Sequence, residues 1–228
     1  NGLKKIYTGN SRIEDETISP DGRFISYKLY KAAGKRKSTI VPDYITESGY
    51  TKDIPGREKV GQPHGTEKFF IFDRLNDSIL EVKTNIIEGI RDLPEYLKDY
   101  PTEWDSAKKE NALRKVDFSS AQWSPEGKNL VVDIRSQDHK DRWLMLWDTA
   151  QKKLKLLDRQ HDRAWIDGPG IWNSGWINEE NYWYQSEATG YSHLYAINVQ
   201  TGKKETTSGK YEVLDAKLSN DKKYFYIS

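Results

Sequence analysis

The sequence contains no cysteine among its 228 residues, so disulfide bonds, thiolate metal sites and cysteine nucleophiles are all excluded. It has no apolar run of about 18 residues, the length that a membrane-spanning helix needs. Its net charge is only +1, which argues against nucleic acid or an anionic lipid surface as the main partner. No glycine-rich phosphate loop or dinucleotide fingerprint is found either, and we expect no cofactor.

Aromatic residues, in contrast, are abundant, with 8 Trp and 14 Tyr, and a short turn recurs along the chain. Aromatic side chains suit half-buried, pleated surfaces, so the composition favours β-strands. The two best copies of the turn are Ser19-Pro20-Asp21-Gly22 and Ser124-Pro125-Glu126-Gly127. Proline presets φ and glycine takes the left-handed conformation, which lets two strands fold back on each other. Weaker copies follow at residues 177–181 and 218–223.

Strand-like segments follow the copies of the turn in the same order, which predicts a repeated four-stranded antiparallel meander. In the clearest copy these segments are residues 121–123, 129–134, 142–148 and 153–157. Once two insertions are set aside, successive turns lie about 35, 54 and 41 residues apart, near the roughly 40–50 residues of a propeller blade. A sandwich of two sheets would not need this recurrence and is the weaker interpretation.

We therefore expect an all-β fold, with residues 1–228 as part of one β-propeller and blades starting near residues 15, 121, 171 and 211. About three blades would be complete and the others partial, and residues 3–8 would be the outer strand of a preceding blade. Residues 30–67 form a polar insertion. A second insertion covers residues 84–115, where Thr102-Glu103-Trp104-Asp105 resembles a capping box and predicts a helix to about residue 115.

Neither end of the sequence looks like a natural terminus, which indicates a segment of a longer protein. Closed propellers need at least about four blades, and a shorter row would leave apolar faces bare at both ends. We therefore expect either further blades in the parent protein or a homodimer formed through the open faces.

Particular motifs in the chain match a known family. The most specific ones are Asp158-Arg159-Gln160-His161, Trp165 and Gln185-Ser186-Glu187-Ala188-Thr189-Gly190-Tyr191-Ser192-His193-Leu194-Tyr195. Earlier ones are Val41-Pro42-Asp43-Tyr44-Ile45-Thr46-Glu47-Ser48-Gly49-Tyr50, Ile54-Pro55-Gly56-Arg57 and Lys68-Phe69-Phe70-Ile71. Together they resemble the N-terminal propeller of the dipeptidyl peptidase IV branch of the prolyl oligopeptidase family, of the bacterial type. The resemblance covers nearly the whole chain.

The resemblance implies an architecture and a function beyond what the spacing of the turns predicts. Members of that branch have an eight-bladed propeller that caps an α/β-hydrolase domain with a Ser-Asp-His triad. The propeller excludes folded proteins and helps to grip a short peptide. The chain would then be a non-catalytic propeller part of a serine peptidase active in proteolysis, with the hydrolase domain absent from it. Its partners would be the peptide substrate and that hydrolase domain, and its location would be periplasmic or secreted.

The same resemblance points to residues that would line the substrate chamber: Trp165, Gly168, Gly170, Glu187 and Tyr191. Family members place an aromatic residue and an arginine just after the tryptophan that matches Trp165. Here that stretch is Ile166-Asp167-Gly168-Pro169-Gly170, which has neither, so we expect a wall of backbone at this place. The paired glutamates that hold a substrate amine in the exopeptidases have no counterpart in residues 1–10.

Residues of catalytic type have simpler structural interpretations. Ser192 lacks the second glycine of a Gly-x-Ser-x-Gly elbow and lies between two strands, so we expect no catalytic residue in this chain. Glu179 and Glu180 occupy a hairpin turn and are expected to be solvated. The ligand-type residues between Asp158 and Asp167 have no recognised metal spacing, and a polar loop is favoured over a metal site.

A second class of function stays open, because the two insertions could hold a protein partner on a free-standing binding propeller. A propeller glycosidase would need two opposed carboxylates near the axis, which the sequence does not place. The hypothesis that we carry forward is a propeller that gates and orients peptides, without peptidase activity of its own.

Overall fold

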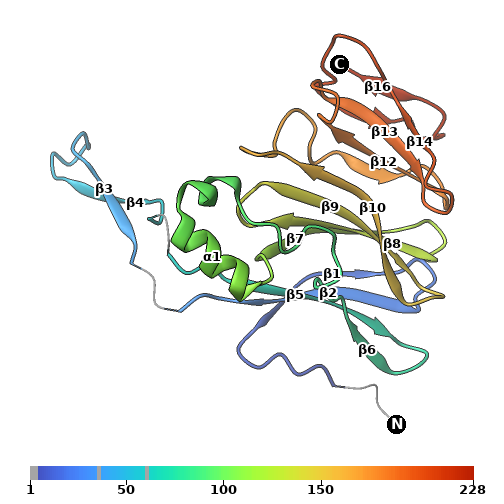
Figure 1. Cartoon of the computed structure of the whole chain (residues 1–228), viewed down its shortest axis with the longest axis horizontal. Coiled ribbons are helices and arrows are strands. Elements are labelled where there is room, and N and C mark those ends of the chain that lie inside the picture. The colour runs from blue at the N-terminus through green and yellow to red at the C-terminus, as the bar shows by residue number, and fades with distance from the viewer. Residues whose placement is uncertain (1–4, 35–36, 60–61) are drawn as a thin grey trace.

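The computed structural model describes residues 5–34, 37–59 and 62–228, and strands dominate these ranges (Figure 1). The first sheet has the order β1 (Arg12–Ile18), β2 (Phe24–Lys31), β5 (Thr66–Asp73), β6 (Ser78–Glu81). The second has the order β7 (Val116–Trp123), β8 (Asn129–Ser136), β9 (Asp141–Asp148), β10 (Lys153–His161). The third has the order β11 (Ser174–Trp176), β12 (Asn181–Ser186), β13 (His193–Asn198), β14 (Lys204–Thr206). The fourth pairs β15 (Ala216–Leu218) with β16 (Phe225–Ile227). All pairs are antiparallel.

The repeated turn joins the first two strands of a sheet, and its serine holds it closed. The backbone N–H of Gly22 donates to the carbonyl of Ser19 at 2.7 Å, and the Ser19 hydroxyl accepts from the backbone N–H of Phe24 at 2.8 Å. Gly22 has φ +69°, a conformation that glycine adopts without strain. The worn copy near residue 219 keeps the same hydrogen bonds, with Lys222 in the left-handed position at φ +59°.

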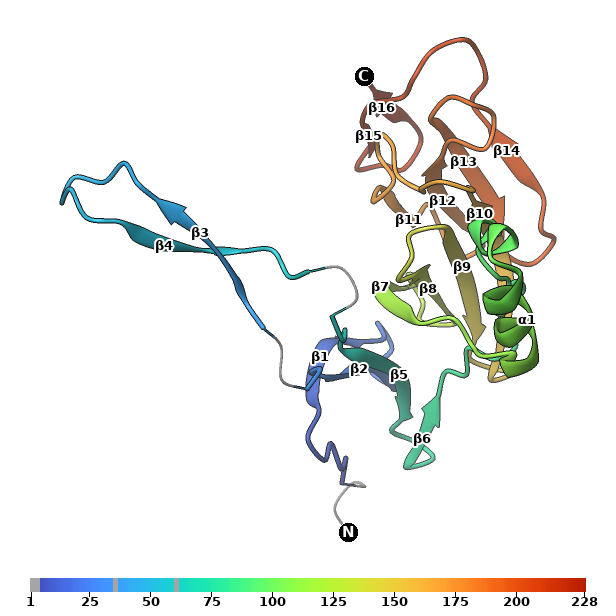
Figure 2. The ribbon, with the colours of Figure 1, turned by 60° about the vertical axis from the view of Figure 1, so that its left-hand side comes forward.

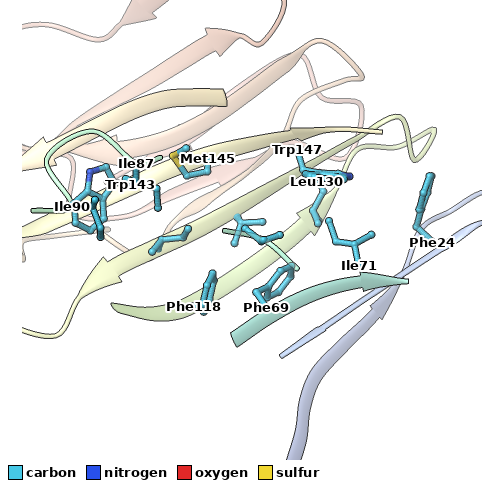
Figure 3. Packing of buried hydrophobic residues seen from close by; sticks show 13 residues of the cluster. Phe24, Phe69, Ile71, Ile87, Ile90, Phe118, Leu130, Trp143, Met145 and Trp147 are labelled. Atoms are coloured by element: carbon cyan, nitrogen blue, oxygen red, sulfur yellow. The ribbon is translucent and has the colours of Figure 1, made fainter. Parts of the chain in front are cut away.

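The sheets are held together by apolar cores that lie between consecutive sheets. Leu130 and Val132 on β8 face the first sheet, whereas Val131 between them faces the third. Figure 3 shows the core between the first two sheets, where Phe24, Phe69 and Ile71 meet side chains of the second sheet. Because successive strand residues point to opposite faces, the second sheet buries both of its faces.

This arrangement confirms the predicted β-propeller segment of four-stranded antiparallel blades. A sandwich has one core between two sheets, whereas here separate cores join the first sheet to the second, the second to the third, and the third to the fourth. Within the described residues the sheets form an open row, not a closed ring. Of the strand expected at residues 3–8, Leu3 and Lys4 lie outside the described residues, and residues 5–8 are not in a strand.

Polar contacts between neighbouring blades supplement the cores. Glu179, in the turn of the third sheet, accepts a hydrogen bond from the Ser124 hydroxyl at 2.6 Å and one from the backbone N–H of Glu126 at 2.8 Å. The expectation of a solvated turn was therefore wrong for Glu179, although Glu180 is exposed. Residues 55 positions apart meet here because consecutive turns stack on one another, a contact that the local turn pattern does not reveal.

The first insertion forms a hairpin that extends away from the sheets (Figure 2). Its strands β3 (Thr39–Asp43) and β4 (Lys52–Gly56) pair only with each other. Because β2 extends to Lys31 and β5 begins at Thr66, the insertion is slightly shorter than residues 30–67.

The second insertion contains a short 3-10 helix, η1 (Glu95–Asp99), and the helix α1 (Pro101–Glu110). The helix begins with Pro101 at its first turn and has no side-chain cap, so the predicted capping box at Thr102 is not used. Buried Ile87 and Ile90 anchor the insertion to the core between the first two sheets. The Trp143 indole N–H strengthens this anchor by donating to the carbonyl of Glu88 at 2.9 Å.

Candidate functional site

The repeated turns lie at one edge of the sheets, and nearly all the irregular structure lies at the other. In each meander the first strand ends at the turn edge, and the second strand runs from there to the opposite edge. The third strand returns to the turn edge and the fourth leaves it again. The connections after the second and fourth strands therefore lie at the opposite edge. We call this opposite edge the loop edge. It carries the hairpin β3–β4, the helical insertion and the loops at residues 137–140, 162–173, 187–192 and 207–215.

A cavity of about 340 Å³ lies at the loop edge between the ends of β10 and β12. It combines an exposed tryptophan with several carboxylates and a histidine, and its walls come from the second and third blades. The lining residues are Arg159, Gln160, His161, Asp162, Trp165, Ile166, Asp167, Ile171, Ser186, Glu187 and Ala188.

The loop that forms one wall begins with a turn organised by Asp162. Its carboxylate accepts hydrogen bonds from the backbone N–H groups of Ala164 at 2.6 Å and Trp165 at 2.9 Å. These two hydrogen bonds lower the pKa of Asp162, because they stabilise its charged form. The Trp165 ring stacks on His139 with a centroid distance of 5.7 Å, yet 62% of Trp165 stays exposed. The tryptophan is therefore held in place while one face remains accessible.

Gly168 and Gly170 have positive φ, and they lie where a neighbouring side chain would have to shift to admit a Cβ. Gly168 has φ +114°, and a Cβ there would lie 2.3 Å from the carboxyl carbon of Glu187. Gly170 has φ +68°, and a Cβ there would lie 2.1 Å from the amide of Gln185. The Gly-Pro-Gly segment is thus a backbone surface against which two side chains of the third blade pack.

Two buried polar side chains, Ser192 and Gln185, support the Gly-Pro-Gly segment. The Ser192 hydroxyl donates to the carbonyl of Pro169 at 2.8 Å, and the Gln185 amide donates to the carbonyl of Val213 at 2.8 Å. Ser192 and Gln185 are both fully buried. The neighbouring His193 ring contacts Thr207 and Gly209, not Ser192. Ser192 therefore serves as a structural donor, with no imidazole placed to take its proton.

Glu187 is a carboxylate of the cavity whose surroundings disfavour its charged form. Burial raises its pKa, and the negative charges of Glu212, Asp167 and Asp162 raise it further. Within the described part of the chain, no lysine, arginine or histidine lies within ion-pair distance of Glu187. Repulsion among these carboxylates would fall if a cation entered the cavity.

His161 faces the same cavity and is held by a fully buried carboxylate. Its Nδ1 lies 3.0 Å from Oδ1 of Asp141, and this oxygen also accepts from Nε of Arg159 at 2.8 Å. The other carboxylate oxygen, Oδ2, accepts from Arg114. His161 also lines a second cavity of about 280 Å³, whose other walls include residues of the helical insertion such as Asp92 and Trp104. Asp141 therefore joins the helical insertion to the wall of the first cavity.

The ligand-type residues between Asp158 and Asp167 do not converge. Asp158 is paired with Lys204, Asp162 caps its own turn and His161 is bonded to Asp141. Across the ranges that the structure describes, no group of three or more His, Asp or Glu residues could hold a metal ion. The same ranges contain no helix long and apolar enough to cross a membrane.

The structure brings most of the residues singled out from the sequence to one place. Trp165 and Glu187 line the cavity, and Gly168 packs directly against Glu187. Gly170 packs against Gln185 at the border, whereas Tyr191 lies outside the cavity, tilted against His193. Sequence reasoning missed the supporting roles of Gln185 and Asp141, and considered Ser192 only as a nucleophile. Gln185 and Ser192 lie within the matching segment 185–195, which could have drawn attention to them, whereas Asp141 begins the strand β9 and carries no such signal.

These features define the class of the molecule: part of a β-propeller whose loop edge carries a polar cavity. Residues 94–227, more than half of the chain, match the family model described as the dipeptidyl peptidase IV (DPP IV) N-terminal region. The chain belongs to this family. No curated protein sequence matches it.

Solved bacterial structures have a similar fold at low sequence identity. The dipeptidyl peptidase 4 of Porphyromonas gingivalis is 15% identical, with a TM-score of 0.58 over 88% of this chain and 25% of that one. A putative dipeptidyl aminopeptidase IV from Bacteroides ovatus is 14% identical, with a TM-score of 0.53 over 91% of this chain and 28% of that one. The chain thus spans about a quarter of the length of these proteins.

Proposed function

We propose that this chain is the non-catalytic propeller part of a serine peptidase of the dipeptidyl or prolyl type. In this role it gates and orients a peptide for a separate α/β-hydrolase domain. The family to which the chain belongs supports the proposal, as does the absence of a nucleophile–base pair around Ser192 and His193. The parent protein would be secreted or periplasmic, which fractionation of cells that produce it would test.

The observation that carries the proposal is the cavity at the loop edge with Glu187 and Trp165 in its wall. A carboxylate that lacks a cation and an exposed aromatic ring together suit an ammonium group, through a charge-assisted hydrogen bond and a cation–π contact. The free amino terminus of a short peptide supplies such a group. We therefore assign the cavity to the amino-terminal end of the substrate.

Isothermal titration with an unblocked Xaa-Pro peptide and its N-acetylated counterpart tests this assignment. The unblocked peptide should bind more tightly, by about fivefold, since an exposed ion pair contributes about 1 kcal/mol. Glu187→Gln should remove that preference, whereas Glu180→Gln, a substitution in the distant turn, should keep it. Equal affinity for the two peptides in the unsubstituted chain would refute the assignment.

The absence of catalysis is tested directly with a chromogenic Xaa-Pro substrate. The isolated chain should give no turnover. Activity that survives extensive purification would contradict the proposal, and its loss in Ser192→Ala would assign the catalysis to Ser192. The sequence of the parent gene offers a further test: a Gly-x-Ser-x-Gly motif should follow residue 228 within roughly 200–250 residues, the size of an ordinary hydrolase domain. A parent that ends after another blade or two would favour the free-standing binding propeller.

A further inference from the structure

The second cavity, of about 280 Å³, lies between the helical insertion and the second blade, and we call it the insertion cavity. Figure 1 and Figure 2 both place α1 beside the second sheet. Leu93 and Trp104 of the insertion line the cavity, and Lys140, His161 and Arg163 of the second blade line it too. The insertion cavity therefore combines an apolar wall with a basic one.

The carboxylates in the walls of the insertion cavity already have cationic partners. Each of the three has its own arginine: Asp92 with Arg159 at 2.6 Å, Glu95 with Arg163 at 2.5 Å, and Asp138 with Arg114 at 2.7 Å. The lining residues include four lysines and arginines against these three carboxylates: Lys98, Arg114, Lys140 and Arg163. The walls thus carry an excess of positive charge.

Lys140 is the lining cation with a free donor. Its ammonium group donates to the backbone carbonyls of Arg163 and Ala164, the latter at 3.1 Å. In the part of the chain that the structure describes, no carboxylate lies within ion-pair distance of Lys140. An ammonium group has three donors, so one remains after these two hydrogen bonds. A half-buried ammonium group with a spare donor suits a carboxylate, through a charge-assisted hydrogen bond.

The insertion cavity adjoins the cavity that contains Glu187, which we call the Glu187 cavity. His161 lines both of them. The turn at residues 162–165 also contributes to both, because Trp165 lines the Glu187 cavity and Arg163 lines the insertion cavity. A ligand that extends across His161 therefore contacts both cavities.

The loop at residues 137–140 holds that turn in place. The backbone N–H of Asp162 donates to the carbonyl of Lys140 at 3.0 Å, and that of Ile166 donates to the carbonyl of His139 at 2.8 Å. Together with the hydrogen bonds of the Lys140 ammonium group, these contacts fix the turn on both sides. The wall shared by the two cavities is therefore preorganised.

The two cavities differ in charge. The Glu187 cavity is lined by three carboxylates and one arginine: Asp162, Asp167, Glu187 and Arg159. The insertion cavity has the excess of positive charge described above. A molecule with an amine and a carboxylate a short distance apart complements both cavities, and a short peptide is such a molecule.

We propose that the insertion cavity binds a carboxylate of the same short peptide whose amino terminus lies beside Glu187. Lys140 donates the charge-assisted hydrogen bond, Arg163 adds a second positive charge, and Trp104 covers the apolar part of the ligand. The carboxylate belongs to an acidic side chain or to the C-terminus of the peptide. This inference rests on the proposed function and makes the helical insertion a determinant of substrate preference.

Isothermal titration of the 228-residue chain with a small set of peptides tests the proposal. The reference is Ala-Pro-Gln amide, which has a free amino terminus and no carboxylate. Glu-Pro-Gln amide, Ala-Pro-Glu amide and Ala-Pro-Gln with a free C-terminus each add one carboxylate at a different place. At least one of them should bind about fivefold more tightly than the reference. The peptide that does so identifies the source of the carboxylate.

Substitutions in the basic wall test which groups bind the carboxylate. Lys140→Met should abolish the gain, because it keeps most of the side chain and removes the charge, whereas Lys140→Arg should retain most of it. Arg163→Gln should lower the gain by about half, and it should not disturb folding because the Arg163 side chain is 78% exposed. Lys153→Met is the matched control, since Lys153 is an exposed lysine at the far end of β10 and should have no effect.

Two outcomes would overturn the proposal. The first is that none of the added carboxylates improves binding over the reference. The second is that the gain survives in both Lys140→Met and Arg163→Gln. In either case unblocked peptides can still bind more tightly than N-acetylated ones, and the role of Glu187 then stands. A gain that depends on Lys140, combined with equal affinity for acetylated and unblocked peptides, would instead refute the assignment of Glu187 and support the carboxylate site.

Discussion

The contact between Glu179 and the turn of the preceding blade should contribute measurably to stability. Glu179 accepts from the Ser124 hydroxyl and from the backbone N–H of Glu126, so one carboxylate satisfies two donors of the neighbouring turn. Hydrogen bonds to charged groups contribute about 1.5–3 kcal/mol each when buried. Because Glu179 is only partly buried, we expect Glu179→Ala to cost about 2 kcal/mol in total.

Urea unfolding followed by tryptophan fluorescence gives the change in free energy, and thermal unfolding should show a fall in Tm of about 4–8 °C for a chain of this size. Glu179→Gln should cost about half as much, because an amide oxygen can replace only one of the two acceptors. The neighbouring Glu180 is exposed, and Glu180→Ala should change stability by less than about 0.5 kcal/mol.

A double-mutant cycle with Ser124→Ala isolates the contact between blades from the role of serine inside its own turn. The Ser124 hydroxyl also accepts from the backbone N–H of Asn129 at 3.0 Å, so the single substitution should be costly. The coupling energy between Ser124 and Glu179 should be about 1 kcal/mol. If Glu179→Ala matches Glu180→Ala in stability, or if the coupling is zero, the stacked turns do not stabilise the blade interface.

Three further predictions concern the buried parts of the site and its charge. Gly170→Ala should cost at least about 2 kcal/mol by thermal unfolding, since both its positive φ and a close side chain oppose a Cβ, whereas Gly190→Ala, at positive φ in open space, should cost about half as much. Arg142→Ala should cost about 3–5 kcal/mol in urea unfolding, because it leaves buried Asp133 with only the longer 3.5 Å contact to Arg135; a loss below 1 kcal/mol would contradict this. The pKa of Glu187 is raised in the folded state, so its contribution to stability is present at low pH and is lost as pH rises from 4.5 through the raised value. Glu187→Gln should therefore be at least as stable as the parent at pH 7, with no difference near pH 3 in a pH series of thermal melts.

The blade architecture could be predicted from the sequence because its signals are local. The turn at Ser19 is closed by hydrogen bonds within five residues, and alternation along β8 assigns each side chain to one face. Spacing alone therefore indicated the repeat. The helix of the second insertion was predicted in the right region, but Pro101, one residue before the proposed cap, determines where it starts.

The candidate site could be predicted only in part. Trp165 and Glu187 lie within a segment that resembles the family, and the structure places both in one cavity. The residues that shape the cavity come from strands far apart in the sequence. Asp141, at the start of β9, contacts Arg114 at the end of the second insertion and Arg159 on β10. No periodicity in the sequence relates these three positions.

The sequence by itself therefore determined the repeating meander and the family, since both are recorded in short stretches of neighbouring residues. Tertiary structure alone decided that Glu179 joins two blades, that the Gly-Pro-Gly segment packs against Glu187, and that the hairpin β3–β4 stands free of the other sheets. These contacts depend on how whole sheets are oriented against one another, and that orientation results from side-chain packing in the cores between them.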